Sequence, residues 1–284
     1  MSLARRLAHG VAEWVVGPNL REVAADAWRR SFGAKNPAIR VLQNRYAGRD
    51  RCFVIGNGPS LKAMDLRPLA DEVTIGANSF YKHPLAADVR LKFLCVFDPH
   101  FMRDEPRSVD WHRTIDERLP EASFLFHHSA SSLVKKHQLY SGREVFYVQS
   151  GKWTHRGNFV DFDFYRLRNV GMTTGSSIAI PLAVFLGFKK IYLIGFDCNW
   201  LENTSGSYHF YDRHDQFPEF DSIAKDNRGM SYEKFLQTIH REFESHRLIR
   251  EKAASLGVEI FNATDGGLLD VYPRVAYADC FQKP

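Results

Sequence analysis

The chain of 284 residues contains no run of 18 apolar residues, and its first residues lack the long apolar centre of a signal peptide. A membrane-spanning helix and export by that route are therefore not expected. Only four cysteines occur, widely scattered, and Cys52 and Cys95 lie within apolar runs. This pattern is typical of buried, reduced thiols rather than a disulfide framework or a zinc site, so we expect a cytoplasmic protein.

Three further absences narrow the function. There is no Walker-type Gly-Lys-Ser or Gly-Lys-Thr, which argues against a conventional P-loop kinase. Beyond the first 48 residues there is no basic stripe with interleaved aromatic residues, so no nucleic-acid partner is expected. The 38 basic and 33 acidic residues nearly balance, and the net charge of +5 favours an acidic partner only weakly.

Residues 1–48 carry basic and aromatic side chains at roughly helical spacing, interrupted at Gly17-Pro18. We expect an N-terminal helical arm that packs on the domain or on a second subunit of a homo-oligomer. The alternative is peripheral contact with the inner face of a membrane, with tryptophan at the interface and arginine toward anionic lipid.

Residues 49–284 alternate apolar, strand-like runs with helical or irregular segments. This pattern predicts a Rossmann-like α/β domain, with a mostly parallel sheet and helices on both faces. The first strand begins near Arg51, and a long helix is predicted from Tyr232 to about Leu256. The other predicted strands span 72–77, 91–97, 123–127, 144–149, 190–196 and 258–262.

The turn after the first strand reads Gly56-Asn57-Gly58-Pro59-Ser60, and a helix is expected to start at Leu61. Glycines let a ligand approach the backbone, and free N–H groups of a first helical turn favour an anion. Pro59 suits a first helical position, and the Ser60 hydroxyl could bond to a phosphate oxygen. The alternative is an ordinary strand-to-helix turn that merely needs glycine.

A second unit of this kind reads Thr174-Gly175-Ser176, followed by a short apolar helix that Ser176 or Ser177 could cap and Gly187 ends. Ligands of parallel sheets bind beyond the carboxyl ends of the strands. Candidate polar residues at such ends are Asn57, Asn78, Asp98 and Asp197.

Residues 199–230 lose all periodicity and are rich in polar and aromatic residues, including Tyr208, His209 and His214. A loop of this length in a compact domain is usually a lid or a disordered connection, and its composition favours a lid. Histidine has the unperturbed pKa, about 6.5, that suits a general base near neutral pH.

In order along residues 50–280, these motifs and the closing run from Gly257 to Gly267 resemble the DUF115 group. That group includes 6-hydroxymethylpterin pyrophosphokinase (MptE)-like proteins and Maf-type flagellin glycosyltransferases. The first three elements also resemble the bacterial sialyltransferases of glycosyltransferase family 42.

The second resemblance implies a CMP-activated, sialic-acid-like sugar donor and a cell-surface glycan or glycoprotein acceptor, with no required cofactor. It implies nucleotide or donor contacts at Gly56, Asn57, Gly58, Pro59, Ser60, Asn78, Asp98, Thr174, Gly175, Ser176 and Asp197. Tyr208 in the predicted lid joins this set. In family 42 the histidine that acts as general base lies just before the long helix, and this chain has no histidine there. His209, flanked by aromatics, and then His214 are the candidates instead.

Three other functions remain open at this point. A diphosphokinase that transfers diphosphate from ATP to a pterin would need Mg²⁺ held by carboxylates such as Asp98 and Asp197. The second alternative is transfer of a different nucleotide-activated group, and the third is nucleotide binding without catalysis.

Overall fold

A computed structural model of the chain describes residues 36–148, 162–166, 176–202, 208–211 and 231–282. Most of the predicted arm, the pair Thr174 and Gly175, His214 and the larger part of the predicted lid lie outside these residues.

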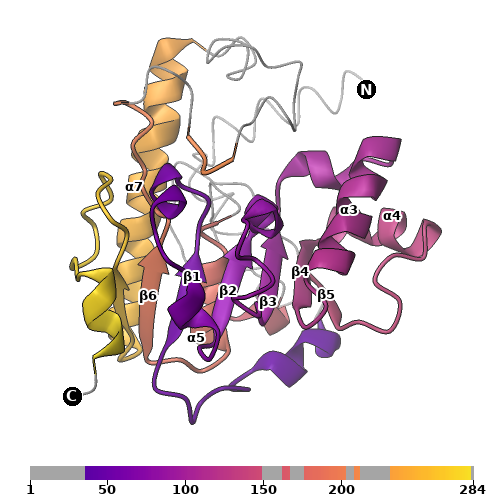
Figure 1. Ribbon diagram of the computed structural model, residues 1–284, viewed down its shortest axis with the longest axis horizontal. Coiled ribbons are helices and arrows are strands. Elements are labelled where there is room, and N and C mark those ends of the chain that lie inside the picture. The colour runs from indigo at the N-terminus through magenta and orange to yellow at the C-terminus, as the bar shows by residue number, and fades with distance from the viewer. Residues whose placement is uncertain (1–35, 149–161, 167–175, 203–207, 212–230, 283–284) are drawn as a thin grey trace, which may run out of the picture.

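The centre of the fold is a sheet of seven parallel strands in the order β5-β4-β3-β2-β1-β6-β7 (Figure 1). The α/β, Rossmann-like prediction is thereby confirmed, and every predicted strand is present, with ends trimmed by up to two residues. The strands are β1 (Cys52–Ile55), β2 (Thr74–Ala77), β3 (Phe93–Val96), β4 (Ser123–His127), β5 (Val145–Val148), β6 (Lys190–Ile194) and β7 (Glu259–Asn262).

Alternate residues of each strand point into two separate apolar cores, because successive side chains of a strand face opposite sides of the sheet. In β1, Cys52 and Val54 belong to one core, while Phe53 and Ile55 belong to the other. All four residues are fully buried, as expected for a parallel sheet covered on both faces.

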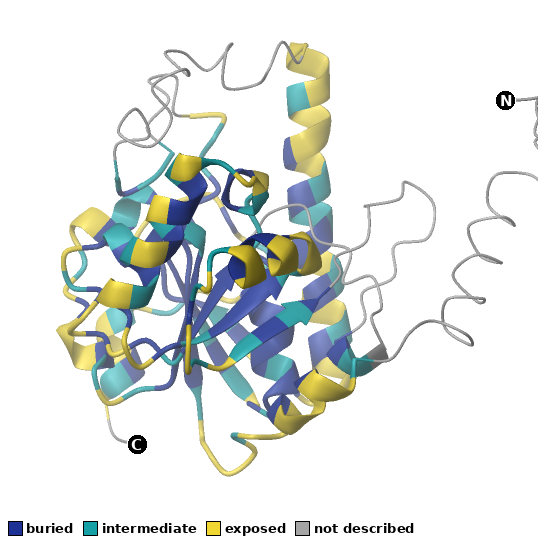
Figure 2. Ribbon diagram, turned by 90° about the vertical axis from the view of Figure 1, so that its right-hand side faces the viewer, coloured by how far each residue is buried: buried dark blue, intermediate teal, exposed yellow. Residues whose placement is uncertain are grey.

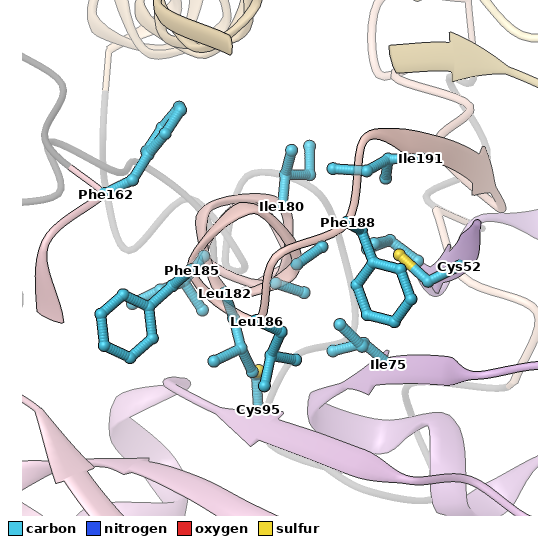
Figure 3. Packing of buried hydrophobic residues seen from close by; sticks show 14 of the residues in the cluster. Cys52, Ile75, Cys95, Phe162, Ile180, Leu182, Phe185, Leu186, Phe188 and Ile191 are labelled. Atoms are coloured by element: carbon cyan, nitrogen blue, oxygen red, sulfur yellow. The ribbon is translucent and has the colours of Figure 1, made fainter. Parts of the chain in front are cut away.

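Helices cover both faces, as predicted. One core includes residues of α5 (Ala179–Phe185) and α7 (Tyr232–Ser255). Figure 3 shows two residues that follow α5 in this core: Phe188 lies beside Cys52 and Ile75, and Leu186 lies over Cys95. The other core includes residues of α3 (Pro106–Arg118) and α4 (Ser131–Lys136). The sheet and the helices on its two faces thus form a three-layer domain.

Short 3₁₀ helices fill many of the connections. They are η1 (Pro37–Leu42), η2 (Pro59–Lys62), η3 (Arg67–Leu69), η4 (Asn78–Lys82), η5 (Pro99–Met102), η6 (His128–Ala130), η7 (Phe164–Arg166) and η8 (Tyr277–Phe281). In η1, Ile39 and Leu42 are fully buried in the core that holds α5, so the end of the predicted arm packs on the domain.

The predicted long helix is confirmed. The Ser231 side chain caps α7 by accepting a hydrogen bond from the Lys234 N–H, and Gly257 follows the helix with a left-handed φ of 66°. The first turns of α7 are mostly exposed, and its later turns bury one side of the helix against the domain (Figure 2). None of the described helices is long and apolar enough to cross a membrane.

The helix predicted after the first strand is present as the short 3₁₀ helix η2, with Pro59 at its first position as expected, but it ends at Lys62, and a second 3₁₀ helix, η3, begins at Arg67. One local prediction was wrong. The N-cap of α5 is Ile178, so neither Ser176 nor Ser177 occupies the cap position that was predicted for it. Gly187 does follow α5 with a φ of 99°, as its predicted role at the helix end requires.

All four cysteines are buried and unpaired, which confirms the reading of the thiols from the sequence.

Candidate functional site

The chain changes direction across the sheet between β1 and β6. Strands β1 to β5 follow one another outward to one side, and β6 and β7 lie on the other side of β1. Open parallel sheets bind ligands at such a point, in the crevice between loops that diverge from the strand ends. Ile55 pairs with Ile194 in the sheet, so the turns that begin at Gly56 and Gly195 lie side by side there. We use the term crevice for this place at the sheet edge, between residues 56–60 and 195–197.

Ser60 and Asp197 join these two turns. The Ser60 N–H donates to Asp197 Oδ1 over 2.9 Å, and the Ser60 hydroxyl donates to Oδ2 over 2.8 Å. Gly58 permits this approach, because a Cβ at residue 58 would lie 1.7 Å from Asp197 Oδ2. We refer to this arrangement as the Ser60–Asp197 clasp.

The clasp corrects the expected anion site. The Gly58 N–H donates to the Gly195 carbonyl over 2.9 Å, and the Ser60 N–H is held by Asp197. The N–H groups of Gly58 and Ser60, which were expected to be free for a ligand, are therefore occupied by the protein. The negative charge beside this turn is the chain's own carboxylate, and the glycine at 58 makes room for that carboxylate.

Asp197 is almost completely buried, at 5% exposed. Burial disfavours the charged carboxylate and raises its pKa, while the two bonds from Ser60 oppose this shift. The backbone of Asp197 is held as well, since its carbonyl accepts the Leu268 N–H over 2.6 Å. A Cβ at Gly267 would lie 2.6 Å from that carbonyl oxygen, which explains a glycine whose role the sequence did not reveal.

Asn57 lies between β1 and β2 and is 7% exposed. Its amide nitrogen donates to the Ala77 carbonyl over 2.9 Å, while its Oδ1 is buried and has no hydrogen-bond partner among the described residues. Leaving a buried acceptor unpaired costs about 1–3 kcal/mol. An oxygen in this position is suited to accept a hydrogen bond from a ligand, such as a base amine or a ribose hydroxyl.

Asn78 and Asp98 follow β2 and β3. Asn78 has a left-handed φ of 43°, and its Oδ1 accepts the N–H groups of Phe97 and Asp98 over 2.9 and 3.3 Å. Asp98 Oδ1 in turn lies 2.9 Å from both the N–H and the ring Nδ1 of His100. The Oδ1 atoms of Asn78 and Asp98 thus hold the backbone in place after β2 and β3.

One described piece of the predicted lid lies on the β1 turn. The Phe210 N–H donates to the Asn57 carbonyl over 2.9 Å, and the Phe210 ring packs against His83 at 5.1 Å. Beside it, His209 stacks on Tyr211 at 4.9 Å, and Lys82 Nζ lies 5.0 Å from the centre of the Tyr211 ring. Residues 208–211 therefore form a strap over the turn.

The structure brings most of the described candidate residues to one edge of the sheet. Gly56, Asn57, Gly58, Pro59, Ser60 and Asp197 meet at the crevice, and Phe210 places Tyr208 and His209 next to it. Ser176 lies before α5, where its carbonyl accepts the Ala179 N–H. Among the described residues, no three histidine, cysteine or acidic side chains gather as a metal site.

Sequence reasoning did not single out His127, the last residue of β4. Its ring lies 6.1 Å from that of Phe97, at the same edge of the sheet. The available signal was its place at a strand end, directly after the apolar run Phe124-Leu125-Phe126.

Residues 31–203, more than half of the chain and including both turns of the crevice, match the family described as 6-hydroxymethylpterin diphosphokinase MptE-like. Among curated proteins, none matches the chain in sequence.

Two solved structures show distant similarity in fold. The sialyltransferase CstII from Campylobacter jejuni, solved with the substrate analogue CMP-3FNeuAc, has 15% identity and a TM-score of 0.47 over 80% of this chain and 87% of its own. The Maf glycosyltransferase from Magnetospirillum magneticum AMB-1 has 15% identity and a TM-score of 0.49, over 93% of this chain and 42% of its own.

Proposed function

The chain belongs to the 6-hydroxymethylpterin diphosphokinase MptE-like family, and on that premise we propose that it is a transferase with a nucleotide-activated donor. The donor binds in the crevice between β1 and β6. One observation carries this proposal: the buried Oδ1 of Asn57 lacks a partner among the described residues, at the point where the strand order reverses. A nucleotide supplies the missing hydrogen-bond donor.

The transferred group that we favour is a sialic-acid-like sugar carried by CMP, with a glycan hydroxyl as acceptor. The support lies in the two carboxylates that Mg²⁺-dependent diphosphate transfer would require. Asp197 is held by Ser60, and Asp98 is held by His100, so the described geometry does not present them as a pair for a metal. Transfer of diphosphate from ATP to a pterin remains the second candidate, because it is the reaction for which the family is named.

The chemistry of sugar transfer requires few protein groups. The acceptor oxygen forms a bond to the anomeric carbon, and the bond from that carbon to the phosphate oxygen breaks. CMP leaves with the electron pair of the broken bond, and the acceptor proton passes to a base. We assign the base to His209, which the strap holds beside the crevice. The strap also helps to exclude water from the donor.

A nucleotide screen by thermal shift tests the proposal. CMP, CDP, UDP, ATP and GTP are compared, each with and without Mg²⁺. A ligand at 100 times its Kd stabilises the folded chain by about 2.7 kcal/mol, which is readily detected. We expect CMP to stabilise the chain without Mg²⁺. Stabilisation by ATP alone, dependent on Mg²⁺, would favour the diphosphokinase, and no stabilisation by any nucleotide would overturn both.

A further inference from the structure

The carboxyl edge of the sheet continues from the crevice to β4 through a series of direct contacts. Asn57 donates to the Ala77 carbonyl, which joins the ends of β1 and β2. Asn78 Oδ1 accepts the Phe97 N–H, which joins the ends of β2 and β3. The Phe97 ring meets the His127 ring edge to face, with 74° between the planes, which joins the ends of β3 and β4. His127 is therefore part of one connected edge with the crevice.

The hydrogen bonds of His127 determine which ring nitrogen carries its proton. Nδ1 accepts the Ser129 N–H over 3.3 Å and lies 2.7 Å from the Ser129 hydroxyl. A backbone N–H can only donate, so Nδ1 must present a lone pair to it. A neutral imidazole bound in this way carries its proton on Nε2. Nε2 has no partner among the described residues.

The surroundings of the ring favour this neutral form. Partial burial lowers the pKa of His127, and the neighbouring His128, whose ring lies 4.5 Å away, lowers it further. At neutral pH the lone pair on Nδ1 therefore accepts the hydrogen bond from the Ser129 N–H. The ring thus offers a fixed N–H donor at the edge of the sheet, and its lone pair is not available to act as a base.

We propose that the Nε2–H of His127 donates a hydrogen bond to the group that the nucleotide donor carries on its phosphate. β4 is the third strand from β1, a span of about 14 Å at roughly 4.8 Å per strand. A nucleotide in the crevice would extend its transferred group along this edge. The bound atom is an oxygen of that group, either a hydroxyl or a carboxylate. This inference rests on the proposed function.

Histidine side-chain NMR on the full chain tests the contact. The His127 Nε2–H signal, assigned by its loss in His127→Asn, is followed during titration with CMP and with CMP-N-acetylneuraminate. We expect the intact CMP-sugar to shift this signal and CMP to bind without shifting it. Equal shifts with both ligands, or binding of both with no shift, would overturn the assignment. If neither ligand binds, the proposed function fails and this inference falls with it.

Two variants separate the proposed role of His127 in ligand binding from its role as the N-cap of η6. His127→Asn keeps an acceptor near the position of Nδ1 and removes the donor at Nε2. His127→Gln places an amide nitrogen near Nε2 and loses the cap. We expect His127→Asn to weaken CMP-sugar binding by about 5- to 30-fold with an unchanged Tm. His127→Gln should retain more of that affinity but lower the Tm by a few degrees, roughly the effect of losing one cap. A purely structural residue would give the opposite order, and His127→Asn would then retain full affinity.

Discussion

Two histidines of this molecule, one in the core and one at the carboxyl edge of the sheet, differ in how completely their ring nitrogens are bonded by the protein. On the buried side of α3, His112 is fully buried, and its two ring nitrogens lie 2.7 Å from the Tyr140 hydroxyl and 2.8 Å from the Phe101 carbonyl. At the carboxyl edge of the sheet, His127 has a protein partner on one nitrogen only. Burial lowers the pKa of both imidazoles. The difference teaches that a saturated histidine serves the fold, whereas one with an open nitrogen at a strand end is available to a ligand.

The largest expected effect is at the edge, in His209→Ala. Loss of the general base should reduce turnover about 100- to 10,000-fold, with nucleotide affinity little changed. The free energy of unfolding should fall by less than about 1 kcal/mol, because the side chain is only partly buried. Turnover of CMP-sugar and urea unfolding measure the two quantities. Near-normal turnover would remove the base from residue 209, and His214→Ala would then be the next variant to assay.

At the buried side of α3 the effects should be reversed, with a large change in stability. His112→Ala leaves a cavity and strips the Tyr140 hydroxyl and the Phe101 carbonyl of their partner. We expect a loss of about 2–5 kcal/mol in unfolding free energy. The exposed His240 supplies a control, since His240→Ala should change stability by less than about 0.5 kcal/mol. A His112→Ala chain that is stable but fails to bind CMP would contradict the contrast between the core histidine and the histidine at the sheet edge.

Gly58→Ala tests whether the clasp shapes the crevice. The added Cβ would collide with Asp197 Oδ2, so either the carboxylate or the β1 turn must move. We expect a cost of about 1–3 kcal/mol in urea unfolding, together with loss of CMP binding. Gly48→Ala is the matched control, because nothing lies within 4 Å of a Cβ at that position. Equal stability and affinity in the two variants would show that the clasp is dispensable.

The smallest effect concerns the pH dependence of the clasp. The pKa of Asp197 in the folded chain lies above the ordinary value of 3.8, so the folded state binds more protons between the two values. Its contribution to stability is therefore present below 3.8 and is lost as pH rises through the folded pKa. Relative to Asp197→Asn, the natural chain should lose stability across that window, by at most about 1.4 kcal/mol per pH unit. Parallel pH profiles would contradict this result.

The fold could be predicted largely from the sequence, because each buried parallel strand is a continuous apolar run. The candidate site could be predicted from the sequence only in part. That Asn57 and Asp197 end neighbouring strands depends on the strand order, and no local pattern specifies that order. The turn chemistry was misassigned because Gly58 and Ser60 suit an anion, and the sequence does not say that the anion is Asp197, 137 residues away.

His127 shows the same limit at β4. An apolar run ending in histidine gives the strand and its end, yet the partner that fixes the ring is Ser129 and the ring that meets it is Phe97. The contact with Ser129 is local, whereas the contact with Phe97 arises only when β3 and β4 are paired. Predictions at Thr174, Gly175 and His214 remain predictions, since these residues lie outside those that the structure describes.

The central claim is that a nucleotide occupies the crevice between β1 and β6. A crystal structure of the chain with CMP tests it most directly. We expect the nucleotide beside the turn from Gly56 to Ser60, with a base amine or ribose hydroxyl within hydrogen-bond distance of Asn57 Oδ1. CMP bound elsewhere, for example along α7, with Asn57 Oδ1 still lacking a partner, would contradict the claim.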